Sequence, residues 1–174
     1  MRQLWAPWRL QYVGAPKVEG CIFCAAFSGN DDHKSLIVYR SALAFVILNL
    51  FPYNSGHAMV VPYRHRARME DLSDPEKLEL MSVLDLTIRA QEIALHPEGT
   101  NVGVNLGRAA GAGIEDHLHI HVVPRWVGDT NFMPVLGDTK VIPEHLEATY
   151  QRLHDAFAAL IAEEPARRTK LGGA

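Results

Sequence analysis

Residues 117–125 read His-Leu-His-Ile-His-Val-Val-Pro-Arg, a run in which histidine alternates with large apolar residues. Side chains of a β-strand point alternately to its two faces, so this spacing predicts a strand whose three imidazoles share one face. We expect the apolar face, which carries Leu118, Ile120 and Val122, to enter the core, and the histidine face to form an exposed ledge. Three ionisable rings in register on one ledge indicate a chemical site rather than an ordinary solvated surface.

The segments around this run predict an α+β domain in which two main helices cover an antiparallel sheet of about five strands. The other four strands are expected at the apolar runs 36–39, 43–48, 58–61 and 101–106. One helix begins at the capping-box signature 73–76 and extends to about Leu95, with one stripe of Leu80, Leu84, Thr87 and Gln91. The other begins at Pro143, and its apolar stripe consists of Leu146, Tyr150, Leu153, Phe157 and Leu160.

Length and charge restrict the organisation of the chain and its partners. The 174 residues contain no Gly/Ser linker, which predicts one buried core: an N-terminal arm (1–20), a domain (21–162) and a flexible C-terminal tail (163–174). A formal net charge of −3 and a pI near 6.3 disfavour nucleic acid as a partner. Because the sequence has neither a signal-peptide core nor an apolar run that could cross a bilayer, we expect no membrane association and a cytoplasmic location.

The spacing of the three histidines limits the chemistry that they can share. Alternate residues of a strand lie about 6.5–7 Å apart, so the outer pair, His117 and His121, is about 13 Å apart, too far for all three to bind one metal ion. A hydrolytic zinc centre, which is a competing interpretation, would use two of them and a ligand from elsewhere. The pattern suits one central imidazole whose neighbours fix its orientation, because neutral imidazole is available near pH 7 and can attack phosphorus.

This run and its flanks resemble the histidine triad family. Asn105-Leu-Gly-Arg-Ala-Ala-Gly-Ala-Gly-Ile and Pro124-Arg-Trp-Val-Gly-Asp-Thr-Asn-Phe132 are similar to its diadenosine tetraphosphate phosphorylase branch, close to the fragile-histidine hydrolases. The resemblance, which extends from about Trp5 to Phe157, implies a histidine triad fold and a homodimer or dimer of dimers. It also implies an enzyme that cleaves dinucleoside polyphosphates, adenine nucleotides above all, at the α-phosphate through a nucleotidyl-histidine intermediate, with orthophosphate or water as acceptor.

The same resemblance implies roles for single residues. His119, the middle histidine, is expected to be the nucleophile, and His121 to hydrogen-bond phosphate oxygens or the bridging oxygen. His57 matches a further active-site histidine. Asn49 matches a position that contacts the ribose or base, and Asn105 a position near the α-phosphate.

The loop 107–113 is rich in glycine and alanine, which lets backbone N–H groups approach an anion, although an ordinary turn has the same composition. It lacks the Lys-Ser/Thr ending of a P-loop. Relatives carry Ser, Thr or Gln just before the triad, where this chain has Ala112 and Gly113. We therefore expect phosphate contacts from backbone amides, including those of Gly111 and Gly113, and from Arg108.

Cys21 and Cys24 have a Cys-x-x-Cys spacing with three interpretations: a redox pair, two bystander cysteines, or half of a structural zinc site. Nothing around them reads as the start of a helix after a strand, which disfavours the redox pair. The resemblance to Cys-x-x-Cys-bearing triad proteins and galactose-1-phosphate uridylyltransferases favours structural zinc and implies the ligands Cys21, Cys24, His65 and His117. No redox cofactor is expected.

Two other functions compete with the cleavage of dinucleoside polyphosphates. The same triad suits a hydrolase of small adenylates such as nucleoside phosphoramidates. Outside catalysis, the alternative is a protein that binds adenine nucleotides without turnover.

Overall fold

A computed structural model describes residues 20–129 and 144–171, with side chains as far as residue 163. The predicted N-terminal arm, apart from Gly20, lies outside the described residues. The described strands form one antiparallel sheet in the order β1-β2-β3-β5-β4, which confirms the predicted sheet. The strands are β1 (Ile37–Arg40), β2 (Ala44–Leu48), β3 (Ala58–Pro62), β4 (Gly99–Gly103) and β5 (Ile120–Arg125).

Strand β5 is shorter than the alternating run predicts, because it begins only at Ile120. Its pairing with β3 ends at the Val60–Ile120 pair, and the preceding Leu118 N–H donates instead to the Arg66 carbonyl oxygen (2.6 Å). The alternation nevertheless persists, since Leu118, Ile120 and Val122 are all buried in the core, as predicted.

The histidine side of the run differs from the predicted exposed ledge. His117 is fully buried and His119 is 4% exposed, whereas His121 is half-buried. The ring of Phe23 lies over both buried imidazoles, with centroid distances of 5.4 Å to His117 and 5.0 Å to His119. The expectation of an exposed ledge was wrong because a helix that the sequence analysis did not predict covers this part of the sheet.

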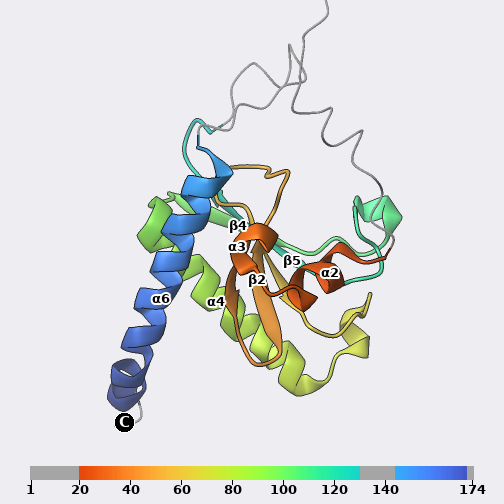
Figure 1. Cartoon of the computed structure of the whole chain (residues 1–174), viewed down its shortest axis with the longest axis horizontal. Coiled ribbons are helices and arrows are strands. Elements are labelled where there is room, and N and C mark those ends of the chain that lie inside the picture. The colour runs from red at the N-terminus through yellow and green to blue at the C-terminus, as the bar shows by residue number, and fades with distance from the viewer. Residues whose placement is uncertain (1–19, 130–143, 172–174) are drawn as a thin grey trace, which may run out of the picture.

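Two long helices, α4 (Asp74–Leu95) and α6 (Leu146–Leu171), lie together on one side of the sheet (Figure 1). The predicted stripe of α4 and the α6 stripe from Tyr150 onward are buried, whereas Leu146 is partly buried. Helix α6 continues through 163–171, a segment that we expected to form a flexible tail. The Ala, Glu, Arg and Lys residues in this segment favour helix. None of the described helices is both long enough and apolar enough to cross a membrane.

The opposite face of the sheet packs against a second, smaller cluster around Phe23 of α2 (Ile22–Ser28). Helix α2 and the neighbouring α3 (Asp32–Ser35) were not predicted, because helices of seven and four residues are too short to show a helical repeat. Two 3₁₀ turns, η1 (Met69–Asp71) and η2 (Arg108–Ala110), complete the described elements. The histidines lie on this second face, beneath α2.

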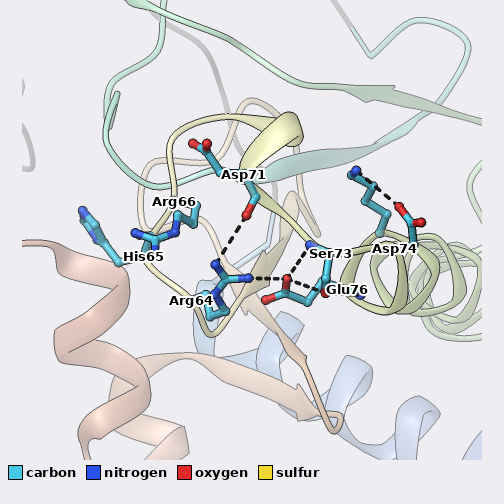
Figure 2. Close-up of polar contacts among 8 residues, drawn as sticks. Arg64, His65, Arg66, Asp71, Ser73, Asp74 and Glu76 are labelled. Atoms are coloured by element: carbon cyan, nitrogen blue, oxygen red, sulfur yellow. Dashed lines mark hydrogen bonds and ion pairs between the residues drawn. The ribbon is translucent and has the colours of Figure 1, made fainter.

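The first turn of α4 contains the predicted capping box, and it also holds the loop that follows β3. Glu76 Oε2 accepts hydrogen bonds from Ser73 N (2.7 Å) and Ser73 Oγ (2.8 Å). Arg64 Nη1 donates to the same carboxylate oxygen (2.6 Å), and Arg64 Nη2 donates to the Asp71 carbonyl oxygen (3.4 Å). Figure 2 shows Arg64 directed toward Glu76 and Asp71, with His65 on the side of the loop away from α4. The capping box thereby restrains the loop that carries His65.

Replacing Glu76 by alanine should lower the free energy of unfolding by about 1–2 kcal/mol, because the cap and the buried partner of Arg64 are lost together. Urea denaturation measures this change. Asp74→Ala is the matched control in the same helical turn, and we expect it to cost less than about 0.5 kcal/mol because its ion pair with Lys77 is exposed. Equal losses in the two variants would contradict the role of Glu76.

Candidate active site and metal centre

His117 joins a cluster of four potential metal ligands. Its Nε2–H donates to the Pro62 carbonyl oxygen (2.8 Å), so its Nδ1 lone pair faces Cys21 Sγ (3.2 Å) and Cys24 Sγ (3.7 Å). His65 Nδ1 lies 3.4 Å from Cys24 Sγ, and all four ligand atoms lie within 4.8 Å of one another. Ligand atoms of a tetrahedral zinc ion are about 3.3–3.8 Å apart, so the cluster fits zinc with little rearrangement.

The chemistry of the cluster also suits a soft divalent metal. Two sulfur and two imidazole ligands match zinc rather than magnesium or calcium, which prefer oxygen. Burial raises the pKa of the Cys24 thiol, and the adjacent Cys21 sulfur raises it further, so the two thiolates need a cation to coexist. The structure brings together all four residues that the resemblance implied as ligands.

The geometry also bears on the two competing interpretations of metal and cysteine chemistry. Cys21 is the N-cap residue of α2, so the pair does begin a helix. A strand leading into that helix would fall before Gly20, outside the described residues, so the argument against a redox pair stays a prediction. What favours metal binding is the presence of two imidazoles within reach of the sulfurs. A hydrolytic zinc centre with two triad histidines is not supported, because His117 is the one triad residue that joins a metal-type cluster within the described residues.

The backbone carbonyl of His117, the triad residue in the metal cluster, holds His119 in one tautomer. Its Nδ1–H donates to the His117 carbonyl oxygen (2.8 Å), which leaves the Nε2 lone pair unprotonated. Burial lowers the pKa of His119 and so favours this neutral form. A neutral, oriented imidazole is the form that attacks an electrophile.

A chain of hydrogen bonds sets the protons of His57 and His121. The Tyr53 N–H donates to His57 Nδ1 (3.0 Å), and Asn49 Nδ2 lies 3.3 Å from the same atom. The His57 proton therefore resides on Nε2, which donates to His121 Nδ1 (3.0 Å). As a result His121 carries its own proton on Nε2. The expected ribose or base ligand, Asn49, thus lies against His57.

Two hydrogen-bond donors converge beside the triad. Asn105 Nδ2 lies 3.5 Å from His121 Nε2, and since both atoms carry protons, both are available to an oxygen atom placed between them. The loop residues Arg108, Gly111 and Gly113 are exposed. Within the described ranges, the Arg108 side chain makes no hydrogen bond or ion pair. The structure therefore places His57, His119, His121 and Asn105 in one site, whereas the phosphate contacts expected from Arg108, Gly111 and Gly113 stay predictions.

The imidazoles of His57 and His121 are neutral at physiological pH. Burial, together with the nearby His121 and His119, lowers the pKa of His57 to about 3. Burial and the nearby His119 lower the pKa of His121 to about 4. The proton order of the hydrogen-bonded chain therefore persists across the range in which a free histidine titrates.

A cavity of about 390 Å³ opens beside His121. Its lining includes Tyr53, Asn101, Asn105 and Arg125, of which Asn105 alone was predicted as a site residue. Asn101 begins a run that was predicted to be a strand, but only the pairing of β4 with β5 shows that it faces this cavity. Tyr53 carried no signal, because an irregular segment positions it.

Comparisons with known proteins agree with this geometry. The HIT domain model matches residues 30–127. The AP-4-A phosphorylase of Mycobacterium tuberculosis is 41% identical over 166 residues, which cover 91% of this chain and 85% of that protein. An adenosine 5′-monophosphoramidase of Schizosaccharomyces pombe is 33% identical over 105 residues, covering 60% of this chain and 74% of that protein. A solved zinc-bound histidine triad family protein of Mycobacterium smegmatis aligns with a TM-score of 0.65 at 28% identity, covering 82% of this chain and 96% of that one.

The lowered pKa values of His57 and His121 predict that acid destabilises the fold. Below about pH 6.5 the unfolded chain binds protons at both histidines, whereas the folded side chains stay neutral until about pH 4 and 3, so stability falls as the pH falls through this window. Urea denaturation between pH 7.5 and 5 should show a smaller fall for His57→Gln than for the unsubstituted protein. The control is His154→Gln at an exposed site. An unchanged pH dependence in His57→Gln would contradict the assignment.

Proposed function

Because the chain belongs to the HIT domain family, whose enzymes hydrolyse or transfer nucleotides, we propose that it cleaves dinucleoside polyphosphates at the α-phosphate. The observation that carries this proposal is the tautomer of His119, whose Nδ1–H is committed to the His117 carbonyl and whose Nε2 is free to attack. The identity of 41% with a protein named AP-4-A phosphorylase supports diadenosine tetraphosphate as the substrate class.

In the first step, His119 Nε2 attacks the α-phosphorus and forms a P–N bond, while the bond from phosphorus to the bridging oxygen of the leaving nucleotide breaks. The leaving nucleotide departs with that electron pair as a polyphosphate anion. The His119 ring gains a positive charge, which its Nδ1–H shares with the His117 carbonyl oxygen. The N–H groups of His121 and Asn105 donate to the phosphate oxygens, where negative charge accumulates.

In the second step, water or orthophosphate attacks the phosphorus and the P–N bond breaks, which restores neutral His119. From diadenosine tetraphosphate the first step releases ATP. Transfer to orthophosphate then yields ADP, and transfer to water yields AMP. His57 takes no part in bond making, and its role is to keep the His121 proton on Nε2.

Replacing His119 by alanine should lower kcat on diadenosine tetraphosphate by a factor on the order of 10⁶, as removal of other enzymic nucleophiles does. Chromatography of the products, with and without orthophosphate, measures the rate and identifies the acceptor. ADP and ATP formed only with orthophosphate indicate a phosphorylase, and AMP and ATP formed in both conditions indicate a hydrolase. The exposed His145→Ala is the control and should retain full activity. More than a tenth of the activity in His119→Ala would disprove the covalent route.

We also propose that the cluster of Cys21, Cys24, His65 and His117 binds one structural zinc ion. The zinc would link α2 to the triad segment without occupying His119. The description of the Mycobacterium smegmatis relative as zinc-bound supports this proposal.

Elemental analysis should find about one zinc per chain, and Cys21→Ser should lose it and lower the melting temperature, because structural zinc contributes directly to folding. His33→Ala, which removes an exposed histidine outside the cluster, should keep the metal. A zinc-free preparation with unchanged melting temperature and activity would refute the structural role.

A second candidate substrate is a small adenylate. The identity of 33% with an adenosine 5′-monophosphoramidase favours it, since the same adenylyl-histidine could form from a phosphoramidate. If the protein turned over neither substrate, the remaining candidate function would be the binding of adenine nucleotides without catalysis. A homodimer or dimer of dimers and a cytoplasmic location stay predictions, and the exposed β4 at the edge of the sheet offers one surface for a second copy.

A further inference from the structure

The side chains on one face of β5 and of the residues just before it have different roles, which follow one another along the chain. His117 joins the metal cluster, His119 presents the attacking nitrogen, and His121 presents a proton. The next two residues on this face, Val123 and Arg125, line the cavity of about 390 Å³ together with His121. The cavity therefore begins where the proposed reacting groups end.

We propose that this cavity binds the nucleoside carried by the leaving group. The inference rests on the proposed cleavage at the α-phosphate. In phosphoryl transfer the attacking and leaving atoms lie roughly in line on opposite sides of the phosphorus. Since His119 attacks and His121 is the next residue on that face, the leaving chain extends past His121, and the cavity is what it meets there.

The lining of the cavity suits an aromatic base. The ring of Tyr53 is 52% exposed, with its centroid 4.5 Å from that of His57 and 5.7 Å from that of His121. The neighbouring histidine rings hold it at the cavity, where its free face can stack on a base. Val102 and Val123 add apolar surface.

The charges in the cavity favour an uncharged nucleoside over a further phosphate. The one cation in the lining, Arg125, is paired with Asp129 through Nε–Oδ2 (2.5 Å) and Nη2–Oδ1 (2.8 Å) contacts. Arg125 Nη1 donates to Asn101 Oδ1 (2.7 Å), which orients the Asn101 amide nitrogen away from the guanidinium. Within the described ranges that nitrogen has no acceptor, so it is available to the polar edge of a base or to a ribose.

The volume agrees with this assignment, because small-molecule sites measure about 300–1,000 Å³ and this cavity lies at the lower end of that range. A larger side chain in place of Gly103 would fill part of this cavity. Gly103 pairs with His121 in the β4–β5 register and lines the cavity, and a Cβ added there meets no atom within 4 Å. Gly99 on the same strand also has open space around an added Cβ, but it does not line the cavity.

The experiment compares diadenosine tetraphosphate with adenosine 5′-tetraphosphate, which keeps the adenylyl group and the four phosphates but lacks the distal nucleoside. We expect the unsubstituted protein to have a kcat/KM about tenfold higher for diadenosine tetraphosphate, since stacking of one base supplies a factor of this order. Gly103→Val should lower kcat/KM for diadenosine tetraphosphate about tenfold and change that for adenosine tetraphosphate less than about twofold. Because the Tyr53 ring also packs on His57 and His121, Tyr53→Ala should lower both values, with a further loss of about tenfold on diadenosine tetraphosphate alone.

Gly99→Val is the matched control and should change neither value. Sedimentation of each variant checks that the oligomeric state is unchanged, because β4 is an edge strand. Equal rates on the two substrates in the unsubstituted protein, or equal losses on both in the variants, would overturn the nucleoside site while the proposed function stands. Turnover of neither substrate would overturn the proposed function and the nucleoside site with it.

Discussion

His117 donates from Nε2 to the Pro62 carbonyl oxygen, and this fully buried hydrogen bond determines the positions of two different centres. It leaves Nδ1 as a lone pair facing the two cysteines, so the metal cluster depends on it. The backbone carbonyl of the same residue accepts the His119 proton, so the orientation of the nucleophile depends on it too. A buried imidazole without partners would be costly, so the Pro62 carbonyl and the two cysteines together satisfy the His117 side chain.

The two faces of the sheet have different roles: one packs the larger part of the core, and the other carries the histidine site. Helices α4 and α6 cover one side with a large apolar cluster, and α2 covers the other with a smaller one. Burial beneath α2 lowers the pKa of His119, while the contacts of His57 keep the His121 proton on Nε2. The same packing therefore stabilises the fold and holds the proposed nucleophile in its reactive, neutral form.

Much of the fold was predictable because it depends on local periodicity. Alternation in 117–125 and the stripe of α4 identified the core residues, and the capping box marked the beginning of α4. The short helix α2 was missed, and with it the burial of His117 and His119, because seven residues with one buried side chain carry no periodic signal. Of the candidate site, His57, Asn105 and the metal cluster were implied by family resemblance, whereas Tyr53 and Asn101 were not.

The sequence by itself determined which face of each long element is apolar, which residue types are available for chemistry, and that three histidines alternate with apolar residues, since these follow from the spacing of neighbours along the chain. Only the tertiary structure decided that Cys21 lies 3.2 Å from His117, that His57 orients His121, and that the cavity opens beyond His121. These contacts join residues 96 and 64 positions apart, and such distances are set by the register of the sheet and the packing of α2. No local pattern contains that information.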